Sequence, residues 1–130
     1  MDLRAIATDA APRAIGPYSQ GIVAGAGRFV FCSGQIPLDP RSGEMVGAGD
    51  VREQARRVME NLRAVLSASG AEMKHVVKTT IYLTDLATFG HVNEIYGSYF
   101  PQAPPARATV QVAGLPKGAL VEVDAIAVVP

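Results

Sequence analysis

The sequence predicts one α+β domain, a mixed β-sheet with two helices packed on one of its faces. Two observations support this fold class. Short segments near both ends of the chain alternate apolar and polar residues, as half-buried strands do, and two longer central segments carry apolar residues at helical spacing. A chain of 130 residues has the usual length of a single domain, so we place one domain at 1–130.

Two strands are expected before the first helix, at 20–24 and 28–36. The glycine-rich segment 25–27 between them is typical of a tight turn, which predicts that the two strands pair as a hairpin. The segment that follows, 37–49, is rich in proline, glycine and aspartate, and we expect it to be a loop.

The first helix is the most strongly predicted element. Asp50 is suited to cap its N-terminus, Glu53 follows at the spacing of a capping box, and Gly70 is a natural stop. The apolar positions that recur at helical spacing are Val51, Ala55, Val58, Leu62, Val65 and Leu66.

The second half of the chain adds a strand at 75–83, a helix at about 85–99, and strands at 106–112 and 120–128. The apolar stripe of this helix comprises Phe89, Val92, Tyr96 and Tyr99, with Asn93 at its edge. The predicted order of elements is therefore ββ-α-β-α-ββ, with both helices on one face of the sheet.

The charge balance counts against one class of partner, nucleic acids. Twelve Lys and Arg residues match twelve Asp and Glu residues, so there is no basic excess to hold a nucleic-acid backbone. The arginines of the first helix are therefore predicted to line a solvated face, where Arg56 can pair with Glu60 and Arg57 with Glu53.

The compartment is also constrained by the sequence. Cys32 is the only cysteine, which excludes an intrachain disulfide and fits a reducing compartment. The apolar stretch at 125–129 is far too short for a membrane helix, which needs about 20 apolar residues. The first residues of the sequence lack the apolar core of a signal peptide. We expect a cytoplasmic protein that does not bind membranes.

Alternation in the last two strands assigns their residues to faces. If helices cover the apolar face of each strand, Arg107, Thr109 and Glu122 lie on the same, opposite side of the sheet. That side mixes acids with large aliphatic residues and is too apolar for plain solvent. We therefore expect other subunits to cover it and to leave a polar cleft there.

Common catalytic motifs are missing from the sequence. It has no dinucleotide-binding fingerprint, no phosphate-binding loop and no nucleophile elbow. His75 and His91 are separated and, with one cysteine, do not make a zinc ligand set, so we expect no metal. Ordinary structural or surface roles are favoured for both histidines, and a buried apolar role for Cys32.

Several blocks of the sequence nevertheless occur together in the order and spacing of a known family. They are 15–21 (IGPYSQG), 32–37 (CSGQIP), 77–80 (VKTT), 92–96 (VNEIY), 105–110 (PARATV), 115–117 (LPK) and 121–127 (VEVDAIA). On these blocks, which span nearly the whole chain, the sequence resembles the Rid family of the YjgF type, the reactive-intermediate imine/enamine deaminases.

The resemblance implies a chorismate-mutase-like fold and a homotrimer with a cleft between adjacent subunits. It also implies hydrolysis of 2-imino acids to 2-oxo acids and ammonia. Substrates of this class are 2-iminopropanoate and 2-iminobutanoate, which arise from enamines such as 2-aminoacrylate. No metal or organic cofactor is implied.

Within this resemblance, Arg107 is the expected grip on the substrate carboxylate, because a guanidinium can make two parallel charge-assisted hydrogen bonds. Glu122 is expected to orient the attacking water or to transfer a proton, and a half-apolar cleft would raise its pKa. The further residues implied at the substrate-binding site are Tyr18, Ser33, Gly34, Asn93 and Thr109. Thr109 stands where some relatives have cysteine, which argues against thiol chemistry there.

The residues alone leave other readings open. Arg107 is also compatible with an ion pair to Asp124, and Tyr18 and Asn93 with packing roles. Three other functions compete: a non-catalytic trimer that binds 2-oxo acids, a ribonuclease or translation inhibitor, and a holdase chaperone. The 2-oxo acid-binding trimer would need Arg107 but not Glu122. The neutral charge counts against the ribonuclease or translation inhibitor, and a holdase chaperone would need an exposed apolar surface.

Overall fold

The computed structural model describes residues 3–130, which form six β-strands and two α-helices. In chain order the elements are β1 (Leu3–Ile6), β2 (Gly21–Ala24), β3 (Arg28–Gln35), α1 (Val51–Ala68), β4 (Val76–Leu83), α2 (Phe89–Ser98), β5 (Ala106–Gln111) and β6 (Val121–Val129). The predicted α+β class is confirmed, and both predicted helices are present. The second is shorter than expected, because a 3₁₀ turn at Leu86–Thr88 precedes α2.

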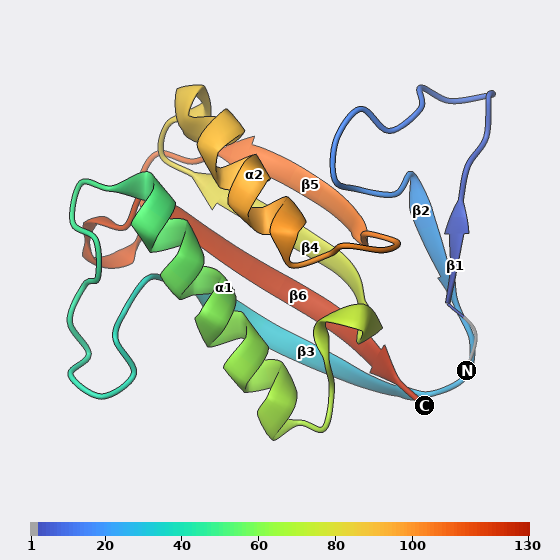
Figure 1. Ribbon diagram of the computed structural model, residues 1–130, viewed down its shortest axis with the longest axis horizontal. Helices are drawn as coiled ribbons and strands as arrows, with labels where there is room; N and C mark the ends of the chain where they lie inside the picture. Colours follow the sequence, from blue (N-terminus) through green and yellow to red (C-terminus); the bar gives the residue numbers. More distant parts are fainter. Residues whose placement is uncertain (1–2) are drawn as a thin grey trace.

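The main sheet has four strands in the order β3-β6-β4-β5. β4 and β5 run parallel, whereas β6 runs antiparallel to both of its neighbours, β3 and β4, so the sheet is mixed as predicted. Figure 1 shows α1 and α2 lying side by side across one face of this sheet, while the other face carries no helix. We call these the helix face and the open face.

α1 forms where the sequence predicts it. The Asp50 carboxylate accepts hydrogen bonds from the backbone N–H groups of Arg52 and Glu53, which confirms the predicted N-cap. The side chain of Glu53 makes no return bond among residues 3–130, so the capping box is incomplete. Gly70 adopts a φ of 80° just after the helix, a conformation that glycine accepts without strain. The buried residues that dock the helix on the sheet are Gln54, Ala55, Val58, Met59, Leu62 and Leu66.

The predicted ion pairs along α1 are wrong. Glu60 lies 3.5 Å from Arg63, one turn further along the helix, instead of pairing with Arg56. Arg57 donates to the side chain of Asn61 at 3.1 Å instead of pairing with Glu53. Exposed pairs of this kind differ by only tenths of a kcal/mol, so spacing alone does not select among them.

The predicted hairpin of β2 and β3 is also wrong. β2 pairs antiparallel with β1, a strand the sequence did not predict, in a separate two-stranded sheet. The chain just before β2 is anchored beside the start of β5, because Ser19 hydrogen-bonds to the carbonyl groups of Pro104 and Pro105. β3 occupies the opposite edge of the main sheet, so the two strands diverge at the glycine-rich bend.

The register of the sheet corrects the face assigned to Arg107 and Thr109. These residues pair with Thr79 and Ile81 of β4, both fully buried on the helix face. Glu122 pairs with Tyr82, which lies on the open face. Arg107 and Thr109 are therefore on the side opposite to Glu122, not on the same side as predicted.

The assumption behind that prediction fails at the edge strand β5. Its apolar residues Ala108 and Val110 line the open face, and its polar residues turn toward α2. The open face is strongly apolar: Phe31 is 75% exposed, Phe29 64% and Val110 41%. Exposed aromatic rings in such a group are typical of a surface that another protein chain covers.

Candidate active site

A pocket of about 370 Å³ lies beside β5, where the strand meets α2 and the segment before β2. Its lining residues are Ile15, Gly16, Tyr18, Phe89, Asn93, Arg107 and Thr109. Four of the residues expected at the substrate site, Tyr18, Asn93, Arg107 and Thr109, are thus brought together from three separate segments of the chain.

Arg107 is the only charged side chain in this lining. Its guanidinium carbon lies 5.2 Å from the ring centre of Tyr18, 5.3 Å from that of Phe89 and 5.2 Å from that of Tyr96. Three rings at these distances hold a planar cation by cation–π attraction and restrict its rotamers. Burial lowers the pKa of Arg107, which nevertheless stays cationic at any physiological pH because a guanidinium starts so high.

The hydrogen bonding of Arg107 leaves most of its donors unused. Nη1 donates to Oδ1 of Asn93 at 2.7 Å, which fixes the plane of the guanidinium. Among residues 3–130 no carboxylate lies within 4.0 Å of it, so the alternative ion pair with Asp124 is not formed. Asp124 instead accepts hydrogen bonds from the Thr80 backbone and the Tyr82 hydroxyl. A cation held in this way is suited to bind an anion from outside the chain.

Thr109 adds a second polar group to the pocket. Its Oγ1 is buried and has no hydrogen-bond partner within the described part of the chain. A buried hydroxyl without a partner is unfavourable, and the cost is recovered when a bound molecule supplies the hydrogen bond. Its position in the same lining as Arg107 makes the pocket able to recognise a small, polar anion.

The other expected site residues gather on the open face. Gly34 lies so close to Glu122 that any side chain at position 34 would collide with the Glu122 carboxylate. Ser33 is the exposed neighbour of Gly34, at an irregularity in the pairing of β3 with β6. Burial, and secondarily the charge of Asp124, raise the pKa of Glu122. A carboxyl group whose pKa is raised is a stronger base than an ordinary carboxylate, which suits it to accept a proton from water.

The expected site is therefore divided into two halves within one chain. The carboxylate-binding half lies on the helix face at β5, and the half with Glu122 lies on the open face of β6, with β4 between the two strands. A small molecule bound to Arg107 cannot reach Glu122 of the same chain through the sheet.

Two site residues were not predicted to have a role there. Phe89 and Tyr96 were placed only in the apolar stripe of the second helix, yet both flank Arg107. Their spacing with Asn93 is the available signal: positions 89, 93 and 96 recur on one helical face. The Tyr96 hydroxyl is buried against Thr79 Oγ1 at 2.7 Å, and burial raises the pKa of Tyr96 to about 12.

Residues 3–130 contain no cluster of three or more His, Cys, Asp and Glu side chains that could hold a metal ion. His75 accepts a hydrogen bond from the backbone of Glu72, and His91 lies beside Arg52, so neither histidine lines the Arg107 pocket. No helix formed by these residues is long and apolar enough to cross a membrane.

Comparison with known proteins places the chain in a family. The family described as Endoribonuclease L-PSP matches residues 8–129. Protein DfrA of Myxococcus xanthus is 63% identical over 98% of this chain and 97% of its own length. The 2-iminobutanoate/2-iminopropanoate deaminase of Mus musculus is 50% identical over 96% of this chain and 90% of its own. The crystal structure of E. coli TdcF with bound serine superposes with a TM-score of 0.75 at 45% identity, over 98% and 99% of the two chains. The chain therefore belongs to the Endoribonuclease L-PSP family, which is also known as the YjgF/RutC/Rid family.

Proposed function

We propose that this protein hydrolyses small 2-imino acids to 2-oxo acids and ammonia. The observation that carries the proposal is the environment of Arg107: a half-buried guanidinium, held by three aromatic rings and Asn93, without a carboxylate from residues 3–130. The carboxylate common to all 2-imino acids fits such a fork through two parallel hydrogen bonds. Relatives with this activity and with a bound amino acid support the choice of substrate class.

The reaction needs only water and proton transfer. The oxygen of water bonds to the imine carbon, the C–N bond then breaks, and both hydrogens of the water leave with the nitrogen as ammonia. The carbon becomes the carbonyl of a 2-oxo acid. Glu122, with its raised pKa, accepts a proton from the attacking water and returns it to the departing nitrogen. Because the imine carbon is already electrophilic, orientation of the two reactants supplies much of the acceleration.

The complete site in this proposal is formed by two copies of the chain. Arg107 and Glu122 of one chain face opposite sides of the sheet, so the Glu122 half must come from a neighbour. The exposed apolar side chains of the open face, which include Phe29 and Phe31 on the edge strand β3, provide the surface for that contact. Two different patches meet in such an interface, and a head-to-tail contact of this kind gives a ring when the rotation between neighbours closes. We infer a ring of three chains, as in the family resemblance, with one site at each interface.

A coupled assay tests the proposed activity. An amino-acid oxidase or threonine dehydratase generates the imine in place, and release of the 2-oxo acid is followed with and without this protein. We expect acceleration by the wild type and none by Arg107→Ala, with Arg41→Ala, at an exposed position of the 37–49 loop, as the matched control. A folded wild-type protein that accelerates hydrolysis of none of the small 2-imino acids would overturn the activity and favour a non-catalytic 2-oxo acid-binding protein.

A further inference from the structure

A second hollow, of about 380 Å³, lies on the outer side of the helix layer between α1 and α2. It is lined by Arg52, Arg56, Arg63, Glu94, Ile95, Ser98 and Tyr99. Neither the proposed imine chemistry nor the proposed ring of subunits uses these residues. Figure 1 shows that α1 and α2, whose residues line the hollow, lie on the face of the sheet opposite to the open face.

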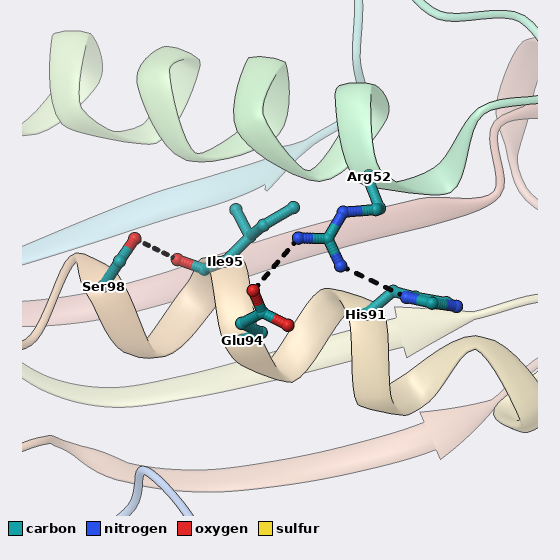
Figure 2. Close-up of polar contacts among 5 residues, drawn as sticks. All are labelled: Arg52, His91, Glu94, Ile95 and Ser98. Carbon is teal, nitrogen blue, oxygen red and sulfur yellow. Dashed lines mark hydrogen bonds and ion pairs between the residues drawn. The ribbon is translucent and has the colours of Figure 1, made fainter.

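Arg52 is fixed at one end of this hollow by residues of α2. Its Nη2 donates to Glu94 Oε1 at 3.1 Å, and its Nη1 lies 3.2 Å from Nδ1 of His91. Figure 2 shows the Arg52 side chain reaching from α1 across the space between the helices to both partners. A guanidinium that is already oriented loses little side-chain entropy when a ligand binds.

Arg63 is fixed at the other end. Its guanidinium carbon lies 4.9 Å above the ring of Tyr99, and its Nη1 lies 3.5 Å from Glu60. Glu60 is shared, because the Tyr99 hydroxyl also donates to it at 2.6 Å. The negative charge of Glu60 is thus divided between a hydroxyl and a long ion pair, and it balances Arg63 only in part.

Arg56 lies between these two ends on the same face of α1 and has no carboxylate within 4.0 Å among residues 3–130. Positions 52, 56 and 63 recur at one helical face, so three guanidinium groups line one side of the hollow. The only carboxylate in the lining, Glu94, has a pKa lowered first by Arg52 and also by His91 and Arg56. The hollow therefore carries an excess of positive charge on a chain whose overall formal charge is zero.

We propose that this hollow binds a small phosphate monoester. Its phosphate group would be held by Arg56 together with the open donors of Arg52, one turn away on the same face of α1, because guanidinium forks match phosphate geometry. Arg63, held about three turns away from Arg52, adds positive charge at the far end of the hollow. Buried Ile95 and the Tyr99 ring form the apolar part of the lining for the organic portion of the ester. The volume is that of a small-molecule site and is too small for a folded partner.

Titration of the ¹⁵N-labelled full-length protein followed by NMR tests this site. The probes are inorganic phosphate and glycerol 3-phosphate at pH 7.5, with sodium chloride at equal ionic strength as the control. We expect saturable shifts of amides in α1 and α2 around the hollow, with the ester binding at least as tightly as inorganic phosphate. Arg56→Gln should weaken binding by about tenfold or more, the loss expected for one charge-assisted contact.

Two further variants separate this site from other anion sites. Arg57→Gln, on α1 but hydrogen-bonded to Asn61 away from the hollow, should bind the ester like the wild type. Arg107→Ala should also bind it, since the proposed active site is a different pocket. Equal shifts with sodium chloride, equal affinity in Arg56→Gln, or loss of the shifts in Arg107→Ala would each overturn the proposal. None of these results depends on imine hydrolysis.

Discussion

Arg107 and Glu122 project from opposite faces of one β-sheet, from strands that are separated by β4. The first is packed between aromatic rings beside α2, and the second lies against Gly34 on the face without helices. Each residue has the properties of one half of a hydrolytic site: a fixed cation for a carboxylate, and a carboxyl group with a raised pKa. The separation explains why the proposed reaction requires a second copy of the chain.

Replacing Arg107 with lysine tests whether the guanidinium geometry matters beyond its charge. Lysine keeps the positive charge but loses the bidentate contact and the hydrogen bond to Asn93. We expect kcat/KM for 2-iminobutanoate to fall about 100-fold, the equivalent of roughly 3 kcal/mol. Thermal unfolding should change little, because the Arg107 ring contacts lie at the edge of the core. Retention of more than half of the activity in the lysine variant would argue against carboxylate gripping.

Replacing Glu122 with glutamine separates catalysis from binding. The amide keeps the size of the side chain but cannot take a proton from water, so kcat should fall by about 10²-fold or more. Binding of 2-oxobutanoate, measured by calorimetry, should change by less than about threefold, since Arg107 makes the main contact with its carboxylate. Parallel losses in kcat and in 2-oxobutanoate affinity would assign Glu122 to binding instead.

Glu122→Gln should also change the stability of the fold, by an amount that depends on pH. The pKa of Glu122 is raised in the folded state, so its stabilising contribution is complete below the unfolded value near pH 4.3 and is lost as pH rises through the folded pKa. Glu122→Gln should therefore be more stable than the wild type at pH 7.5, and the gain should shrink toward pH 4. Unfolding midpoints in urea at the two pH values measure this difference. A gain that is the same at both pH values would contradict it.

A charge on the open face tests the proposed subunit contact. Phe31 is 75% exposed in the single chain, and Phe31→Asp removes only its stacking on the equally exposed ring of Phe29 while placing a charge where the next subunit would pack. We expect the mass measured by light scattering to fall from three chains to one. Val65→Asp, an exposed apolar position on α1, is the matched control and should remain assembled. A Phe31→Asp protein with the wild-type mass would place the interface elsewhere.

The raised pKa of Tyr96 predicts that the protein loses stability at alkaline pH. Its folded pKa of about 12 lies above the unfolded value near 10, so its contribution is complete below pH 10 and is lost between pH 10 and 12. The size of the loss is about 2 to 3 kcal/mol. Tyr96→Phe loses the hydrogen bond to Thr79 and should be less stable at pH 7 by about 1 kcal/mol, yet decline less steeply above pH 10. Equal alkaline slopes in urea unfolding at fixed protein concentration would contradict this account.

Much of the fold could be predicted because its signals are local. The start of α1 depends on the Asp50 side chain and its end on the Gly70 backbone, and both signals lie within a few residues of the boundary. Local signals do not decide whether β2 and β3 pair as a hairpin. Its turn residues are typical, but Ser19 contacts Pro104 and Pro105, which are 85 and 86 positions away in the sequence, and these contacts draw β2 to the other edge of the sheet.

The two faces of β5 show a second limit of prediction from sequence. Alternation correctly indicates that Arg107 and Thr109 share one face and that Ala108 and Val110 share the other. It does not indicate which of the two faces the helices cover, and the apolar face of an edge strand can equally be the one that another chain covers. The four residues of the Arg107 pocket were expected at one site from the family resemblance, together with Ser33, Gly34 and Glu122. Their separation from Glu122 could not be predicted, because alternation does not indicate which face the helices cover.

The measurement that tests the shared site most directly is complementation between two inactive variants. Arg107→Ala and Glu122→Gln chains are mixed in equal amounts, unfolded, refolded together and assayed for 2-iminobutanoate hydrolysis. If each site joins Arg107 of one chain to Glu122 of its neighbour, random assembly should restore about a quarter of the sites, although neither variant is active alone. Refolded wild type sets the full value. A mixture that stays as inactive as its two components would show that both residues act within one chain and would contradict the account.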